Sequence, residues 1–190
     1  MNRIHQWLCG SAVWVRHAER TLVPWVMDSV DLGTEVLEIG PGYGATTRIL
    51  VGLVPQLTAL EIDADLAHRL TTTVQDVRVV QGDGAAMPFP GDAYSGAVCL
   101  TMLHHVPSPQ LQDMLFAEVH RVLRPGGLFV GSDSRASLGF RLIHLFDTMV
   151  IVEPDTLAGR LTAAGFDQVL VDKVRGAFRF RAHKPWFPLP

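Results

Sequence analysis

Cysteine is scarce in this sequence: Cys9 and Cys99 are the only two among 190 residues. They lie 90 positions apart, and two isolated thiols give neither a disulfide framework nor the closely spaced ligands of a metal site. We therefore expect reduced thiols, as in a cytoplasmic protein, and no bound metal.

Long hydrophobic runs are also missing, and no stretch approaches the roughly 18 consecutive apolar residues that a membrane-spanning helix requires. The first residues lack the charged leader, continuous apolar stretch and small-residue cleavage site of a signal peptide. Stable membrane insertion is thus not expected, and the sequence favours a soluble, intracellular protein.

Basic clusters are few. The chain carries 16 Lys and Arg against 19 Asp and Glu, a formal net charge of −3. A local basic excess near Arg175, Arg179, Arg181 and Lys184 is small, and strand alternation would place several of these side chains on a solvated face. Because nucleic-acid binding normally needs a clustered basic surface, we expect no nucleic-acid partner.

What the sequence does contain is an alternation of strands and helices. With 48% hydrophobic and 18% charged residues, no internal repeat and no linker, residues 1–190 are predicted to form one globular domain. The alternation predicts an α/β fold: a seven-stranded, mostly parallel sheet with helices on both faces and an antiparallel C-terminal hairpin. Strands are expected at 36–39, 57–62, 77–80, 95–101, 128–133, 168–174 and 177–182. Helices are expected at 3–9, 11–30, 45–53, 64–74, 110–123 and 155–164.

A glycine-rich turn follows the first strand, with Gly40, Gly42 and Gly44 leading into a helix. Glycine lets the backbone turn sharply and approach a ligand closely, and the helix directs free N–H groups at the same place. Glu61 ends the second strand 21 residues after Gly40, near the offset at which an acid reaches ribose hydroxyls. These features predict a pocket for an adenosine-containing cofactor, either a dinucleotide or another adenosine compound.

Two further carboxylates help to distinguish these cofactors. Asp83 follows the third strand, where a carboxylate can accept from the exocyclic amine of adenine. Glu38 lies directly before the glycine turn, where it would repel a pyrophosphate and complement a positively charged ligand. S-adenosylmethionine carries an ammonium and a sulfonium and has no phosphate, so this pattern favours it.

Four segments together resemble the class I S-adenosylmethionine-dependent methyltransferases, in particular the small-molecule group that includes the ubiquinone and menaquinone type. The similar segments are 36–44, 83–90, 97–106 and 118–127, the last with the sequence Glu-Val-His-Arg-Val-Leu-Arg-Pro-Gly-Gly. The resemblance runs from about Val36 to Phe129. It implies a Rossmann-like fold and in-line displacement of a methyl group onto an acceptor, with S-adenosylhomocysteine as the leaving product.

The resemblance also implies roles for cofactor-binding residues. Gly40 and Gly42 would lie under the methionine part with Glu38 near its ammonium, and Glu61 would bind the ribose hydroxyls. The remaining cofactor positions are Gly44 in the turn, Ile62 on the adenine face, Asp83 at the adenine amine, Gly84 or Ala85 as a backbone contact, and Thr101 and Met102 on the sulfonium side.

Acceptor-side residues are predicted from their positions after the fourth and fifth strands. His104 or His105 would act as a base or orient the acceptor, although correct positioning can supply much of the catalysis without a base. Asp133 would face the cleft, and Arg141 and His144 belong to a substrate-covering insertion at 134–153. The composition of that insertion suits a small, mostly apolar acceptor with one polar handle.

Alternatives remain at this point. The helices within 1–32 could form a lid over the cofactor or contact a membrane peripherally, because they mix Trp with Arg and His. The whole chain could instead be a dinucleotide-dependent oxidoreductase, against which Glu38 argues, or a module that binds S-adenosylmethionine without catalysis.

Overall fold

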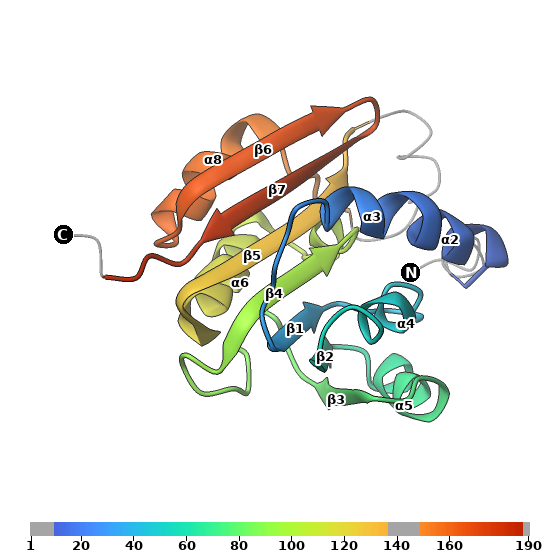
Figure 1. Ribbon diagram of the computed structural model, residues 1–190. Helices are drawn as coiled ribbons and strands as arrows, with labels where there is room; N and C mark the ends of the chain where they lie inside the picture. Colours follow the sequence, from blue (N-terminus) through green and yellow to red (C-terminus); the bar gives the residue numbers. More distant parts are fainter. Residues whose placement is uncertain (1–9, 137–148, 188–190) are drawn as a thin grey trace.

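A seven-stranded sheet organises the computed structural model, which describes residues 10–136 and 149–187 (Figure 1). The strand order is β3-β2-β1-β4-β5-β7-β6. Strands β1 to β5 run parallel, β7 is antiparallel to β5, and β6 is antiparallel to β7. The predicted Rossmann-like fold with its antiparallel C-terminal hairpin is confirmed. The strands are β1 (Glu35–Ile39), β2 (Gln56–Glu61), β3 (Val77–Gln81), β4 (Tyr94–Leu100), β5 (Leu123–Ser134), β6 (Asp167–Val174) and β7 (Ala177–His183).

The order of the strands reverses between β1 and β4. From β1 the chain first builds outward to β2 and β3, and then returns to place β4 on the other side of β1. Loops leaving β1 and β4 therefore diverge, and in open α/β sheets the crevice between them is where ligands bind.

Helices cover both faces of the sheet. On one face α6 (Pro109–Val122) and α8 (Pro154–Ala163) bury side chains such as Phe116 and Leu157 against Leu37 and Ile39. On the other, α4 (Thr47–Leu50) and the N-terminal helix pack on Val36. Next to them, α5 (Ala64–Thr73) packs on Ala59. Alternate residues of β1 thus face two different cores, as expected for a strand buried on both sides.

The N-terminal helix is continuous but not uniform. It comprises α2 (Ala12–His17), a π-helical turn η1 (Ala18–Leu22) and α3 (Val23–Val26), and ends four residues before the predicted boundary at 30. Pro24 lies just after the π turn. Because proline has no N–H, it cannot complete the regular helical hydrogen-bond ladder, which accounts for a wider turn at this point.

Other boundaries differ modestly from the predicted ones. The helix after the glycine turn is four residues long, α4, rather than 45–53, because Gly44 and its neighbours still belong to the turn. Strand β5 begins at Leu123, not 128, since Leu123 pairs with Tyr94 of β4, and the Arg-Pro-Gly-Gly segment forms an irregularity before regular pairing resumes at Leu128. The predicted helix 3–9 lies outside the described residues, as does most of the predicted insertion.

Within residues 10–136 and 149–187, no helix is both long enough and apolar enough to cross a membrane.

Candidate functional site

A cavity of about 520 Å³ opens at the carboxyl ends of β1, β2 and β3 and beside the loop after β4. It therefore lies at the reversal in strand order where a ligand is expected. Eight of the predicted site residues line it: Gly40, Gly42, Glu61, Ile62, Asp83, Gly84, Met102 and His105.

Gly40, Gly42 and Gly44 of the turn all have positive φ, and the space around them differs. A Cβ on Gly44 would lie 2.5 Å from Leu70 of α5, and one on Gly40 would lie 3.0 Å from Met102. A Cβ on Gly42 would meet no atom within 4 Å. Gly40 and Gly44 thus allow close packing within the protein, whereas Gly42 leaves open space in the cavity wall.

Glu61 connects the end of β2 to this turn. Its Oε2 accepts a hydrogen bond from the Gly42 N–H at 2.9 Å, and its Oε1 accepts one from the Asp63 N–H at 3.0 Å. The side chain is buried, yet it lines the cavity. A carboxylate oxygen can accept more than one hydrogen bond, so Glu61 can hold the turn and still accept from ligand hydroxyls.

Glu38, which is predicted to lie near the ammonium of the cofactor, does not line the cavity. It is 1% exposed and lies outside the cavity lining, on the face of β1 that packs under α4. Thr46 Oγ1 donates to its Oε1 at 2.5 Å, and Oε2 has no hydrogen-bond partner in the described part of the chain. Burial raises the pKa of Glu38 to about 7, the hydrogen bond from Thr46 opposes this, and the charge of Glu61 adds to it.

The charge of the cavity is predominantly negative. Glu61, Asp63, Asp65 and Asp83 line it, and no lysine or arginine does so among the described residues. Asp83 is exposed, and its Oδ1 accepts from the Ala85 N–H at 2.8 Å, which fixes the turn after β3. Ala85 itself is buried and lies outside the lining. Such a cavity favours a cationic ligand and disfavours a pyrophosphate.

The residue that follows β4 has a strained backbone. Thr101 has φ +53°, an unusual conformation for a β-branched side chain. Its N–H donates to Ser132 O and its Oγ1 donates to Leu100 O, both at 2.8 Å. Thr101 does not line the cavity, but the bend directs the next residue, Met102, into its wall. Strained residues of this kind cluster at functional sites.

After this bend, a short 3₁₀ turn η2 (Leu103–His105) carries the two predicted histidines. His104 Nδ1 lies 2.6 Å from Asp133 Oδ1, and the His104 backbone N–H donates to Asp133 Oδ2 at 3.0 Å. Both side chains are buried. Asp133 was expected to face the cleft, but it lies outside the cavity lining and holds His104. His105 lines the cavity, with its ring centroid 4.1 Å from that of His104.

Several lining residues have no counterpart among the sequence predictions. Tyr43 of the glycine turn lies under the guanidinium of Arg69, 5.3 Å from the ring centroid. Leu115 of α6 contributes an apolar wall. Buried Gln112 donates to Leu103 O and Val150 O, and so supports the histidine turn from behind. The predicted substrate residues Arg141 and His144 lie outside the described residues.

The protein thus has a Rossmann-like fold with a predominantly acidic cavity at the reversal of its strand order. The family model described as "Methyltransferase domain" matches residues 37–131, half of the chain. The chain therefore belongs to the methyltransferase-domain family. It is a class I S-adenosylmethionine-dependent methyltransferase domain, and S-adenosylmethionine is its cofactor.

Relatives with sequence similarity act on different acceptors, as their names state. Ubiquinone biosynthesis O-methyltransferase of Xanthomonas campestris pv. campestris (strain B100) is 32% identical over 117 residues, 58% of this chain and 47% of that protein. Fatty-acid O-methyltransferase of Mycolicibacterium smegmatis is 32% identical over 107 residues, 54% and 38% of the two chains. Ribosomal RNA small subunit methyltransferase A of Laribacter hongkongensis is 37% identical over 84 residues, which are 44% of this chain and 32% of that protein. The chain thus aligns with about half, or less, of the length of these relatives.

Solved structures with low sequence identity share the fold. A Methanosarcina mazei protein described as an S-adenosylmethionine-dependent methyltransferase has a TM-score of 0.68 at 19% identity, over 86% of this chain and 98% of its own. A Haloferax volcanii putative methyltransferase, solved with the Trm112 activator, has a TM-score of 0.72 at 13% identity, over 97% of this chain and 99% of its own. These likenesses establish the architecture.

Proposed function

We propose that this protein methylates a small, largely apolar molecule, in the manner of the ubiquinone and menaquinone methyltransferases. The observation that carries the proposal is the cavity at the end of β1 to β3, lined by four carboxylates and opened by Gly42. When bound there, S-adenosylmethionine supplies an activated methyl group on a sulfonium, which an acceptor nucleophile displaces.

The residues of the cavity fit this cofactor. Glu61 would accept from the ribose hydroxyls while it keeps the turn in place through Gly42. Asp83 would accept from the adenine amine, and Ile62, which is 65% exposed, would lose water by packing on the adenine ring. The negative field of Glu61, Asp63 and Asp65, with buried Glu38 behind, would complement the ammonium and sulfonium.

A small acceptor is favoured over nucleic acid by charge. The net charge is −3, and the cavity mouth lacks lysine and arginine within the described residues. A polynucleotide would bring phosphates toward this acidic edge, at an electrostatic cost. Met102, Val106, Pro107 and Leu115 add apolar surface to the cavity lining. The names of the ubiquinone and fatty-acid relatives are consistent with an apolar acceptor.

The histidines would assist the acceptor. Because a carboxylate only accepts, the proton of the His104–Asp133 hydrogen bond is on Nδ1, and in the neutral ring Nε2 is then the basic nitrogen. Asp133 fixes the ring through two hydrogen bonds. His105, which lines the cavity, would contact the acceptor and take its proton or orient it.

Calorimetry with S-adenosylmethionine, S-adenosylhomocysteine and NADH tests the cofactor assignment. We expect both adenosyl compounds to bind and NADH not to bind. Replacing Glu61 with Gln should weaken binding of S-adenosylhomocysteine at least tenfold, because one of the two accepting oxygens becomes an NH2 group that faces a backbone N–H and can no longer accept from a ligand hydroxyl. Glu153→Gln, an exposed glutamate outside the cavity, serves as control.

Incubation with radiolabelled S-adenosylmethionine and a panel of phenols, fatty acids and a short RNA then tests the acceptor class. Label should enter a small molecule. Label in RNA would contradict the proposal, and tight NADH binding without S-adenosylmethionine binding would support an oxidoreductase. Cofactor binding without transfer to any acceptor would favour the non-catalytic module.

A further inference from the structure

The first turns of the N-terminal helix stand apart from the rest of the fold. Among the helices of the described chain, α2 alone buries none of its residues, although four of its six are apolar. Trp14 is partly buried and packs against the core on this face of the sheet, whereas Val13 is 72% exposed and faces away from it. The outward side of α2 therefore carries apolar surface that the described part of the protein does not cover.

The other end of the same helix is firmly attached. Leu22, Val23 and Val26 are buried in the core on this face of the sheet. Arg179 of β7 donates from its guanidinium to Trp25 O and lies over the Trp25 ring, 5.5 Å from the centroid. The body of the protein therefore anchors α3 and presents α2. Figure 1 shows α2 reaching beyond the carboxyl ends of β4 and β5, the edge at which the cavity opens.

The outward face of α2 and η1 combines this apolar surface with positive charge. Val13, Arg16, His17 and Arg20 are all exposed and recur at helical spacing. Neither guanidinium makes a hydrogen bond or ion pair with any residue that the structure describes. Glu19 is the one acid on these two turns. The face thus has a net positive charge in a protein whose net charge is −3.

We propose that α2 and η1 dock the protein on an anionic lipid bilayer, with Val13 entering the headgroup boundary and Arg16 and Arg20 contacting lipid phosphates. A helix that places an aliphatic residue beside arginines on its outward face can lie in the interface in this way. Two arginines are fewer than the six to ten phosphate contacts typical of nucleic-acid binding, and an exposed valine among them favours lipid. Docking would place the cavity edge near the bilayer, so that an apolar acceptor could be taken from the membrane; only this consequence rests on the proposed function.

Sedimentation of the full chain with vesicles of phosphatidylcholine, with and without phosphatidylglycerol, tests this proposal. We expect binding to the anionic vesicles that weakens at high salt, since screening shortens the range of the attraction. Each basic residue near an anionic surface strengthens binding about fivefold. The double variant Arg16→Glu/Arg20→Glu should therefore lose roughly 25-fold or more, and Val13→Ser should lose severalfold.

A matched control distinguishes a binding loss caused by this face of the helix from one caused by the change in net charge. Arg78→Glu/Arg175→Glu changes the charge equally at two exposed arginines, on β3 and in the β6–β7 turn, and should reduce binding far less. Both double variants should keep the wild-type unfolding temperature. Equal losses in the two variants, absence of vesicle binding, or a loss confined to a short RNA probe would each overturn the proposal. The vesicle assay contains no cofactor, so failure of the proposed function would leave its result intact.

Discussion

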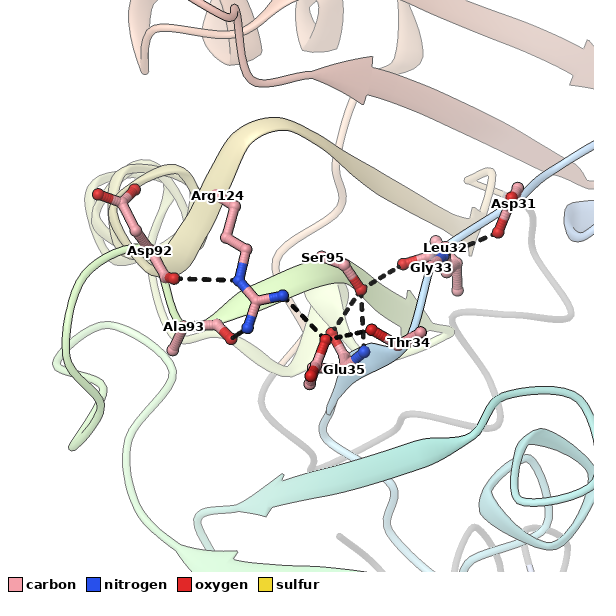
Figure 2. A network of polar contacts seen from close by, with 9 residues as sticks. All are labelled: Asp31, Leu32, Gly33, Thr34, Glu35, Asp92, Ala93, Ser95 and Arg124. Atoms are coloured by element: carbon pink, nitrogen blue, oxygen red, sulfur yellow. Dashed lines mark hydrogen bonds and ion pairs between the residues drawn. The ribbon is translucent and has the colours of Figure 1, made fainter.

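The two ends of the parallel sheet are built in opposite ways. At the amino end of β1, polar groups are paired with one another (Figure 2). Arg124 donates to Glu35 Oε2 and Ala93 O at 2.9 Å and to Asp92 O at 3.3 Å. Ser95 Oγ accepts from the Glu35 N–H at 3.0 Å and lies within donating distance of Leu32 O and Glu35 O. This end joins β1, β4 and β5 into one unit.

At the carboxyl end of the same strands, unfavourable features are concentrated. Glu38 is buried with one unpartnered oxygen, Thr101 is strained, and four carboxylates line one cavity. Burial of Glu38 and the backbone strain at Thr101 each cost free energy, and the four carboxylates repel one another. The amino end thus pairs its polar groups within the protein, whereas the carboxyl end concentrates costly groups at and beside the cavity. Substitutions at the two ends should therefore separate stability from binding.

The largest loss of stability is expected at Asp133, which lies at the carboxyl end but has its hydrogen-bond partners within the protein. Asp133→Ala should lower the free energy of unfolding by about 4 kcal/mol, because the ring Nδ1–H and the backbone N–H of buried His104 both lose their acceptor. Urea unfolding measures this loss. Asp92→Asn, at the amino end, removes a carboxylate that is 60% exposed and pairs with Lys184, and should cost under about 1 kcal/mol. Equal losses would show that the His104–Asp133 pair contributes no more than a surface ion pair.

A pH-dependent effect is expected for Glu38. Its pKa is raised from 4.5 to about 7 in the folded protein, so the folded state holds this proton more tightly than the unfolded chain. The contribution of Glu38 to the free energy of unfolding is therefore fully present below pH 4.5 and is lost as pH rises through about 7. The loss amounts to about 3 kcal/mol, since one pKa unit corresponds to about 1.4 kcal/mol.

Unfolding measured between pH 5 and pH 8 should show this fall in the wild type and a flatter curve in Glu38→Gln. Glu35→Gln, three residues earlier on β1, is the control from the amino end. The hydrogen bonds from Thr34 and Arg124 lower the pKa of Glu35, so its contribution has the opposite sign and the fall above pH 5 should persist. A Glu38→Gln curve as steep as that of the wild type would contradict an ionisable, buried Glu38.

Much of the fold could be predicted from the sequence because its signals are local. Apolar runs such as 57–62 and glycine or proline at the ends of elements act over a few residues, and β2, α5 and β7 lie within two residues of their predicted bounds. Local signals failed where tertiary pairing decides. Pairing with β4 extends β5 back to Leu123, and the N-terminal helix ends at Val26 instead of the predicted residue 30.

The site could be predicted only in part, for a related reason. The glycine turn and Glu61 follow from spacing, and the structure brings them together through the Gly42–Glu61 hydrogen bond. The pairing of Asp133 with His104 joins residues 29 positions apart on neighbouring strand ends, which spacing alone does not reveal. Glu38 was expected at the ligand because of its position before the turn, but the alternation of β1 directs it into the core under α4.

The smallest of these effects is expected for Ser95, in the network at the amino end. Ser95→Ala removes the acceptor for the Glu35 N–H and the donor to Leu32 O or Glu35 O, which should cost about 1 to 2 kcal/mol in the free energy of unfolding. Affinity for S-adenosylhomocysteine should stay unchanged under conditions where the variant is folded, because the cavity lies at the other end of β1 and β4.

Ser134→Ala is the matched control for this change. The Ser134 hydroxyl, at the carboxyl end of β5, makes no hydrogen bond within the described chain, so its removal should alter stability by less than about 0.5 kcal/mol. Thermal unfolding and calorimetry on the two variants give both quantities. Ser95→Ala could instead weaken ligand binding in proportion to its loss of unfolding free energy. The amino-end network would then set the position of the glycine turn through β1, and the two ends would act as one unit.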